Sequence, residues 1–410
     1  MFDELRKLSQ HFLSIKNSPY KRYLLRSTDF TNRMSLIVGQ RGVGKTTLLV
    51  QILLDKVSHD FFDERILYIQ ADHFKLASTP LYEIAEKFST LGGKWLALDE
   101  IHKYPNWSKE LKSIYDTFPE LQIFASGSSA LEIYKGSHDL SRRGVQYHLQ
   151  GMSFREYLEL TYQFTFPSLT LEEICHQHER LAKKIMDELT PKELKVIPLF
   201  HQYLKTGYYP FFYELKNEAL YKITLEQNMH TTIESDIAAI FPQLSGSSIK
   251  KIEKLLVFIA EAVPFTPNWR KIIEVLEIGD ERTLKAYFKH LEDAGLIRSI
   301  AKASKKFSTL ESSEKVYLDN SNQMYAISSN VVEKGTVRET FFLSMAAQNH
   351  QVTLPQKGDF FIDNQYLFEI GGKNKTFDQI KDFDNGYLVL DEMEQGIGQK
   401  IPLWLFGFLY

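Results

Sequence analysis

The sequence predicts an α/β protein whose main domain is a parallel β-sheet with helices on both faces. Apolar runs of strand length recur in the N-terminal part of the chain, at residues 34–39, 65–72, 94–100, 121–128 and 145–149. Helical patterns lie between them, at residues 44–57, 80–91 and 108–117. Continuously apolar strands that alternate with helices are typical of parallel strands buried on both faces. We therefore expect a parallel sheet within residues 1–155.

Three further segments follow this domain. Residues 156–244 are rich in helical patterns. Residues 245–330 contain three short helical patterns and then two strand-like runs, in "LIRSIAKA" and "KVYLDNSNQMYAI", an order that predicts a winged helix. Residues 331–410 predict a small α/β domain. Its expected elements are a helix at 334–349, strands at 359–363 and 366–370, a helix near 375–382 and a strand in "GYLVLD".

The composition is that of a globular protein with two or three domains. The chain has 410 residues, of which 43% are hydrophobic and 25% are charged. A net charge of −3 argues against a surface that coats nucleic acid, although a local basic patch remains compatible with it. Cys175 is the only cysteine, so disulfides within the chain and thiolate zinc sites are excluded. With no signal-peptide pattern and no apolar run near the ~20 residues that span a bilayer, we expect a cytoplasmic protein without membrane contact.

A phosphate-binding loop is the clearest motif in the sequence. "GQRGVGKTT" follows the first strand and opens a helix, and it has the G-x-x-x-x-G-K-[ST] spacing of a P-loop. Its glycines allow backbone N–H groups to surround phosphate oxygens. We expect Lys45 to reach the β- and γ-phosphates and Thr46 to bind Mg²⁺. The expected ATP-binding residues are Gly39, Gln40, Arg41, Gly42, Val43, Gly44, Lys45, Thr46 and Thr47.

An acidic pair ends the third strand. "WLALDE" places Asp99 where it would bind Mg²⁺ and Glu100 beside it, where it would act as the general base toward water. Together with the P-loop, this pair predicts a P-loop NTPase fold that uses ATP and Mg²⁺. His102, two residues further on, is expected to pack or to support the site rather than to act in catalysis.

Other polar residues carry weaker predictions. Ser126 and Ser128 end the fourth strand, which we expect between the strands of the P-loop and of Asp99, and either hydroxyl is a candidate γ-phosphate sensor or part of a polar turn. Arg142 and Arg143 precede the fifth strand, and they are candidate arginine fingers, in cis or in trans, or surface arginines.

With these motifs assembled, the chain resembles a family of bacterial and archaeal AAA+-type ATPases, grouped near the signal-transducing (STAND) NTPases. The segments that carry the resemblance are "GQRGVGKTTLL", "LALDEIHKYPNW", "ASGSSALEI", "LSRRG…YHLQGMSFREYLEL", "GYYP", "KVYLDNSNQMYAI" and "GTVRETFF". The resemblance implies an ATPase core, a helical lid over 156–244, a winged helix, and a C-terminal domain related to PD-(D/E)XK nucleases. It also implies an adenine contact from a Gly-x-Pro element, which is one residue longer here and ends at Pro210.

Basic residues cluster in the predicted winged helix. Residues 249–306 contain 12 Lys and Arg against 8 Asp and Glu. The candidates for phosphate contact with double-stranded DNA are Arg282, Lys285, Lys289, His290, Lys302, Lys305 and Lys306. A solvated helix face, or a winged helix that docks a protein or senses nucleotide, remains an equal alternative.

The C-terminal segment contains part of a nuclease motif. Asp359 and Glu369 match the two metal-binding acids, and Glu339 matches a helical glutamate often found with them. A lysine two residues after the second acid is missing, because Gly371 stands there, and the next lysine is Lys373. A bulge at the two glycines would return Lys373 to the site. A working nuclease, an inactive nuclease-like fold and an unrelated α/β unit stay open.

The sequence therefore predicts a Mg²⁺-dependent ATPase whose nucleotide state controls the winged-helix and C-terminal domains. Two alternatives remain. One is an ATP-gated DNA nuclease that uses Asp359, Glu369 and Lys373. The other is a non-catalytic nucleotide switch in signalling or defence that assembles with a protein partner or as a homo-oligomer.

Overall fold

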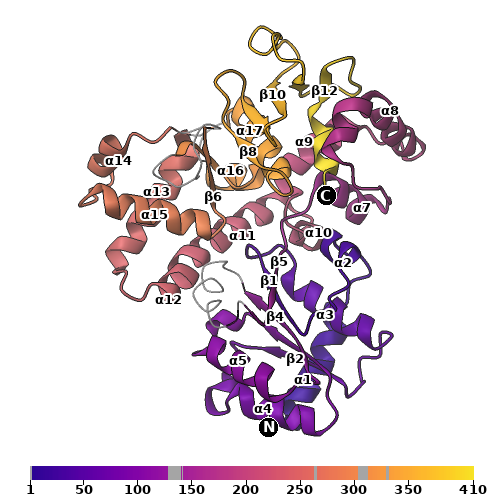
Figure 1. The fold of residues 1–410 in the computed structure, drawn as a ribbon, viewed down its shortest axis with the longest axis vertical. Helices are drawn as coiled ribbons and strands as arrows, with labels where there is room; N and C mark the ends of the chain where they lie inside the picture. The colour runs from indigo at the N-terminus through magenta and orange to yellow at the C-terminus, as the bar shows by residue number, and fades with distance from the viewer. Residues whose placement is uncertain (1, 128–139, 141, 263–265, 303–312, 329–331) are drawn as a thin grey trace. The chain divides into compact units, whose positions relative to one another are not determined.

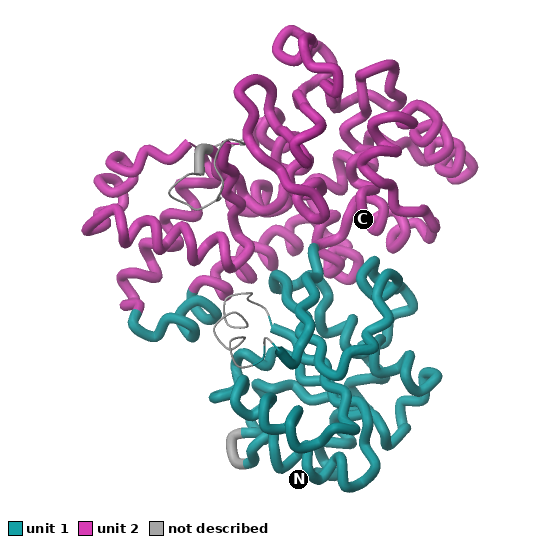
Figure 2. Tube along the Cα trace, in the orientation of Figure 1, with its two compact units in different colours: residues 1–150, 234–243 teal, residues 151–233, 244–410 magenta. Residues whose placement is uncertain are grey.

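The structure is a computed structural model that describes residues 2–127, 140, 142–262, 266–302, 313–328 and 332–410 (Figure 1). Contacts within the chain divide it into two compact units (Figure 2). Unit 1 comprises residues 1–150 and 234–243, and unit 2 comprises residues 151–233 and 244–410. The four-segment division made from the sequence stays a prediction. None of the helices that the structure describes combines the length and apolar character needed to span a membrane.

Unit 1 contains the parallel sheet that the sequence predicts. Its strands are β1 (Met34–Val38), β2 (Ile66–Gln70), β3 (Trp95–Asp99), β4 (Gln122–Gly127) and β5 (Val145–His148). They are ordered β2-β3-β4-β1-β5, and every neighbouring pair is parallel. Strand β4 thus lies between the strand that leads to the P-loop and the strand that ends at Asp99, as expected.

Helices cover both faces of this sheet because its strands are apolar on both. The helices are α1 (Phe2–Lys16), α2 (Tyr23–Ser27), α3 (Lys45–Lys56), α4 (Leu81–Thr90) and α5 (Trp107–Thr117), with short turns η1 (Phe74–Ser78) and η2 (Ile101–Lys103). Alternate strand residues such as Leu36 and Leu98 pack with the apolar stripes of α4 and α5. Figure 1 shows α3 on the opposite side of the sheet from α4 and α5.

A distant segment completes unit 1. The π-helix η4 (Thr232–Ile237) continues into α12 (Ala238–Ile240), and residues 234–243 belong to unit 1 rather than to the helical region in which they lie in sequence. Asp236, Ile237 and Ile240 are buried there. π-Helical turns are rare and occur frequently at functional sites.

The first part of unit 2 is helical. Its helices are α7 (Phe154–Tyr162), α8 (Leu171–Leu189), η3 (Thr190–Lys192), α9 (Val196–Thr206), α10 (Phe211–Leu215) and α11 (Glu218–Thr231). Helices α7 and α8 each begin at a capping box, in which Ser153 pairs with Glu156 and Thr170 with Glu173. These pairs satisfy backbone N–H groups that a helix start leaves without partners.

Three helices and a hairpin follow. They are α13 (Gly246–Ala262), α14 (Trp269–Val275), α15 (Glu281–Asp293), β6 (Ile297–Ala301) and the antiparallel β7 (Ser313–Leu318). The prediction of a strand through "KVYLDNSNQMYAI" is wrong in its second half, because the strand ends at Leu318 and helix α16 (Ser321–Ile327) begins. Asn320 caps this helix by accepting a hydrogen bond from Gln323 N, and an Asn at this position favours a helix start.

A mixed five-stranded sheet ends unit 2. Its elements are α17 (Lys334–Ala346), β8 (Val352–Thr353), β9 (Phe360–Ile362), β10 (Tyr366–Gly371), β11 (Gly386–Leu390), β12 (Lys400–Pro402) and η6 (Leu403–Phe408), with strand order β12-β11-β10-β9-β8. Helix α17 and η6 cover one face, where Phe342 packs on Phe360, Phe368 and Phe406.

The helix expected near 375–382 does not form. Turns replace it. The backbone N–H groups of Lys375, Ile380 and Phe383 donate hydrogen bonds to the carbonyl oxygens three residues earlier, at Gly372, Phe377 and Ile380. Beyond this loop, Asp391 follows β11 and accepts a hydrogen bond of 2.9 Å from Arg338 of α17. His201 of α9 lies 3.1 Å from the same carboxylate. These contacts fix the helical region and the sheet of unit 2 to each other.

Candidate functional site

The P-loop of unit 1 connects β1 to α3 and depends on its glycines. Gly42 and Gly44 have φ angles of 86° and 101°, which residues with a side chain rarely adopt. A Cβ atom at Gly39 would lie 2.2 Å from the carbonyl oxygen of Leu149. Because α3 begins at Lys45, its first N–H groups have no acceptor inside the helix and are available to an anion.

Lys45 is folded back onto the loop. Its Nζ atom donates hydrogen bonds to the carbonyl oxygens of Gly39 and Gln40, at 3.0 and 2.9 Å. Burial lowers the pKa of Lys45, and the carboxylates of Glu100 and Asp99 oppose that shift. The lysine therefore bonds to carbonyl oxygens of the loop itself, and phosphate oxygens can replace these as acceptors.

Asp99 is surrounded by hydroxyl groups. Its Oδ2 atom accepts hydrogen bonds from Thr46 Oγ1 at 2.6 Å and from the Tyr68 hydroxyl at 2.7 Å. Its Oδ1 atom accepts from the Ser126 hydroxyl and from the backbone N–H of Glu100. Burial and the Asp99 charge raise the pKa of Tyr68, so this phenol stays a donor. Tyr68 was not singled out from the sequence, where its place in an apolar strand was the only signal.

The arrangement at Asp99 fits Mg²⁺. Magnesium prefers oxygen ligands and is commonly held by one or two protein oxygens together with substrate phosphates and water. Thr46 and Asp99 supply a hydroxyl and a carboxylate 2.6 Å apart beside the P-loop. These two residues are therefore suited to hold the ion together with a bound nucleotide.

Glu100 has an unusual conformation. Its φ angle is 52°, in the left-handed region that is uncommon for residues with a side chain. Its Oε2 atom is buried and, among the described residues, has no hydrogen-bond donor. Lys103 Nζ lies 3.4 Å from this atom and His102 Nε2 lies 3.7 Å from it. A carboxylate oxygen held in this way beside the phosphate loop is suited to accept a proton from water.

A buried acid from the distant segment reaches the P-loop. Asp236 of η4 is 1% exposed, and its Oδ1 atom lies 3.0 Å from Arg41 Nη2 and 3.8 Å from His102 Nε2. The Asp236 charge also acts on Lys45. Asp236 was missed in the sequence because an acid within a helical pattern carries no local signal of this long-range contact.

The two arginines before β5 differ. Arg143 forms a two-point ion pair with Asp116, at 2.8 and 2.9 Å, on α5. Arg142 is exposed. Its assignment as an arginine finger stays a prediction. Three of the residues singled out in the sequence lie outside the described residues, namely Ser128, Lys305 and Lys306.

The "GYYP" element takes part in a buried polar network of unit 2. Tyr208 N and the Tyr221 hydroxyl donate to Asn322 Oδ1 at 2.9 and 2.5 Å. The Tyr209 hydroxyl accepts from Asn320. This network joins the helical region to the "DNSNQ" segment around α16, which explains why both motifs are polar in a buried position. Pro210 occupies the N-cap position of α10, and its contact with adenine stays a prediction.

In the C-terminal sheet, the lysine that joins the acids is Lys375 and not Lys373. Lys375 Nζ lies 2.5 Å from Glu369 Oε1, whereas Lys373 is exposed in a turn. The side chain of Lys375 crosses over Gly371, where a Cβ atom would meet Lys375 Cβ and Cγ at 2.6 Å. The glycine therefore makes room for the lysine rather than forming a bulge that returns Lys373.

The acids of this cluster influence one another. Burial raises the pKa of Glu369, Lys375 opposes the shift and Asp359 reinforces it. Burial and the charge of Asp359 also raise the pKa of Glu339, which accepts a hydrogen bond of 2.6 Å from the Tyr317 hydroxyl. Glu369 is 1% exposed, and its Oε2 atom has no hydrogen-bond donor among the described residues. Among the residues that the structure describes, no group of three His, Cys, Asp or Glu side chains is placed to hold a metal ion.

Two lysines of α15 are paired with acids of the same helix. Lys285 lies 2.8 Å from Glu281, and Lys289 lies 2.6 Å from Asp293. These i,i+4 pairs reduce the positive charge that the helix presents. Contact of this segment with duplex DNA stays a prediction.

Comparison with known proteins supports the fold of unit 1. Residues 31–158 match a family described as an AAA domain. The match includes the P-loop, Asp99 and Glu100. This match supports an AAA-type fold for residues 31–158. Residues 197–325 match a family described only as a domain of unknown function (DUF8612).

One curated relative is the uncharacterized protein MJ1637 of Methanocaldococcus jannaschii, 30% identical over 254 residues, which are 59% of this chain and 51% of that protein. The chain thus spans about half the length of this relative. Among solved structures, the Walker-type ATPase paby2304 of Pyrococcus abyssi has a TM-score of 0.38 and 13% identity over 78% of this chain and 95% of that one. AMPPCP-bound DnaA from Aquifex aeolicus has a TM-score of 0.29 and 14% identity over 70% of this chain and 88% of that one. Both scores are too low to indicate a shared overall fold.

Proposed function

We propose that unit 1 binds ATP with Mg²⁺ and hydrolyses it. The observation that carries the proposal is the hydrogen bond of 2.6 Å between Thr46 and Asp99, which brings the P-loop and the end of β3 together. Parallel α/β sheets bind ligands at the carboxyl ends of their strands; Asp99 is the last residue of β3, and Thr46 lies in the helix after the loop that follows β1. The match of residues 31–158 to an AAA domain supports the same activity.

In this proposal the phosphates replace the contacts that the P-loop makes with itself. Lys45 leaves the carbonyl oxygens of Gly39 and Gln40 and binds the β- and γ-phosphates, while the first N–H groups of α3 bind phosphate oxygens. Mg²⁺, when held by Thr46 and Asp99, neutralises charge on the transferred phosphoryl group. The Ser126 and Tyr68 hydroxyls keep Asp99 oriented toward Thr46.

Glu100 is the proposed general base. Its Oε2 atom orients a water molecule for attack on the γ-phosphate and accepts the proton. Arg142 is the better arginine-finger candidate of the two, because Arg143 is engaged by Asp116. Sensing of the γ-phosphate by Ser128 remains part of the proposal.

ATP binding and phosphate release measured on the full chain test this function. We expect Mg²⁺-dependent ATP binding and turnover in the wild type and loss of both in Lys45→Ala. Lys56→Ala, in the last turn of the same helix, serves as the control and should bind as the wild type does. ATP binding by Lys45→Ala with unchanged affinity would contradict the site. Tight binding without turnover in the wild type would instead favour a nucleotide switch.

A second function is proposed for the C-terminal sheet, namely binding and cleavage of a nucleic-acid phosphodiester. The observation that favours it is the pairing of Lys375 with Glu369 beside Asp359, which brings two acids and one lysine together as such chemistry requires. Asp359 and Glu369 would share a divalent cation with the phosphate, and Lys375 would orient the attacking water.

Plasmid DNA with Mg²⁺ or Mn²⁺, with and without ATP, tests the second function. Nicking by the wild type that is lost in Asp359→Ala and in Lys375→Ala, and retained in Lys373→Ala, is the expected result. Lys373 is the matched control because it lies two residues from Lys375 and is exposed. Absence of nicking at high protein concentration, or nicking by Asp359→Ala, would remove this function without affecting the proposed ATPase.

A further inference from the structure

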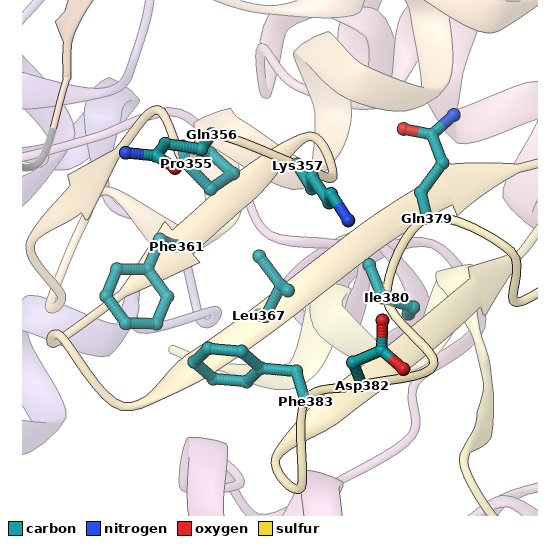
Figure 3. Close-up of a pocket in the computed structure, with 9 residues that line it drawn as sticks. All are labelled: Pro355, Gln356, Lys357, Phe361, Leu367, Gln379, Ile380, Asp382 and Phe383. Carbon is teal, nitrogen blue, oxygen red and sulfur yellow. The ribbon is translucent and has the colours of Figure 1, made fainter.

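A pocket of about 350 Å³ opens on the C-terminal sheet of unit 2 (Figure 3). Its apolar walls are Phe361 of β9, Leu367 of β10, and Ile380 and Phe383 of the loop between β10 and β11. The volume lies within the range of ~300–1,000 Å³ that is typical of small-molecule sites. It is therefore large enough to hold a ring-shaped group.

The pocket lies on the same face of the sheet as the acid cluster. Leu367 is paired with Phe361, and the pairing continues to Asp359, whose N–H donates to Phe368 O. Because side chains alternate along a strand, Phe361 and Asp359 share one face, as do Leu367 and Glu369. Two residues of strand, roughly 7 Å, separate the pocket from the acids. The opposite face is filled by the aromatic side chains under α17.

The pocket presents aromatic surface to solvent. Leu367 and Ile380 are 5% and 2% exposed and form its floor. Phe383 is 42% exposed and meets Phe361 edge to face, with ring centroids 5.7 Å apart. An exposed aromatic side chain over a buried apolar floor provides a stacking surface for a planar ring.

Polar groups surround this surface. The amides of Gln356 and Gln379 each offer a donor and an acceptor, and Lys357 and Asp382 add one charge of each sign (Figure 3). Gly358, with a φ angle of 86°, separates Lys357 from Asp359, so the pocket rim and the acid cluster are two residues apart. A planar group with hydrogen-bond donors and acceptors would match the pocket, and a phosphate attached to that group would match the acid cluster.

We propose that this pocket binds one unstacked nucleobase of a nucleic-acid strand whose phosphate lies at Asp359, Glu369 and Lys375. The inference rests on the phosphodiester site proposed above and names its substrate as single-stranded or frayed nucleic acid. A base can enter a pocket only after it leaves its stack, and that step is least costly where no duplex holds it. Stacking on Phe383 then replaces the lost contact with neighbouring bases.

The test compares two fluorescein-labelled strands of equal length on the full chain, with Ca²⁺ in place of Mg²⁺. One strand is a mixed-sequence DNA of about 12 nucleotides, a length within the site sizes of single-strand-binding domains. The other is entirely abasic, so that its phosphates are the same and its bases are absent. Fluorescence anisotropy gives the Kd of each strand for the wild type, Phe383→Ala, Lys375→Ala and Phe62→Ala. Phe62 is the control because it is an exposed phenylalanine of unit 1, 71% accessible.

We expect the wild type and Phe62→Ala to bind the base-containing strand about tenfold or more tightly than the abasic strand. Phe383→Ala should lose this preference and keep its affinity for the abasic strand. A preference that survives in Phe383→Ala, or no preference in the wild type, would overturn the pocket assignment. Lys375→Ala should bind both strands more weakly and to the same extent. Unchanged affinity of Lys375→Ala for both strands would contradict the phosphodiester site. The comparison of Phe383→Ala with the wild type would still decide the pocket assignment.

Discussion

Removing the side chain of Asn322 should strongly destabilise unit 2. Asn322 is fully buried, and its Oδ1 atom accepts hydrogen bonds from Tyr208 N and from the Tyr221 hydroxyl. Its Nδ2 atom donates to the carbonyl oxygens of Tyr203 and Leu204, at 3.1 and 2.9 Å. The side chain thus satisfies all four of its hydrogen-bonding positions and ties α9 and α11 to α16.

The size of the effect follows from the number of partners. Asn322→Ala removes four hydrogen bonds from the interior, and a buried hydrogen bond contributes about 1 kcal/mol net. The expected loss is about 4 kcal/mol in the free energy of unfolding, a large share of the roughly 5–15 kcal/mol of a typical domain. A loss of this size corresponds to a decrease in Tm of about 8–16 °C for a unit of this size.

Differential scanning calorimetry of Asn322→Ala and Asn374→Ala measures this effect. Asn374 is an exposed turn residue, so its variant should keep the wild-type Tm. A Tm of Asn322→Ala less than about 2 °C below that of Asn374→Ala would refute the reasoning. Such a result would mean that the network contributes little or that water replaces Asn322 at no cost.

Three further predictions concern charge and space. Although burial acts in the opposite direction, hydrogen bonds from neighbouring His and Arg side chains lower the pKa of Asp391 to about 2. Asp391→Asn should therefore lose about 2 kcal/mol of stability at pH 7, and the difference from wild type should vanish as the pH falls from about 4 to 2 in urea unfolding curves. Asp236→Asn should lower the nucleotide-free Tm of unit 1, because about 1–3 kcal/mol is lost when Arg41 has no anionic partner; an unchanged Tm would show that the pair is not stabilising. Gly371→Ala should reduce phosphodiester cleavage as Lys375→Ala does, since the added Cβ occupies the path of the lysine; full cleavage would contradict that path.

The sheet and the P-loop could be predicted because their signals are local. Strands buried on both faces are continuously apolar, and the P-loop is nine consecutive residues between a strand and a helix. The acid pair at 99–100 was identified for the same reason. Each of these features depends on neighbours in the chain, and periodicity or spacing reports such neighbours directly.

The contacts that the sequence did not reveal join residues far apart. Arg41 and Asp236 are 195 positions apart, and no local pattern indicates that a π-helical turn returns to unit 1. The interpretation of Lys373 assumed a bulge at Gly371 and Gly372, whereas β10 ends at Gly371 and Lys375 is the lysine that reaches Glu369. The expected helix at 375–382 was wrong because apolar residues there anchor a loop. Their spacing alone did not distinguish a helix from such a loop.

The proposed ATPase is tested most directly by single-turnover phosphate release from Glu100→Gln and wild type, each with ATP and Mg²⁺ and with Kd measured in parallel. We expect both proteins to bind ATP with similar Kd and the variant to release phosphate about 100-fold or more slowly, since the amide cannot accept the proton of the attacking water. Equal rates of phosphate release by the two proteins would contradict the assignment of Glu100 as the base and with it the proposed mechanism.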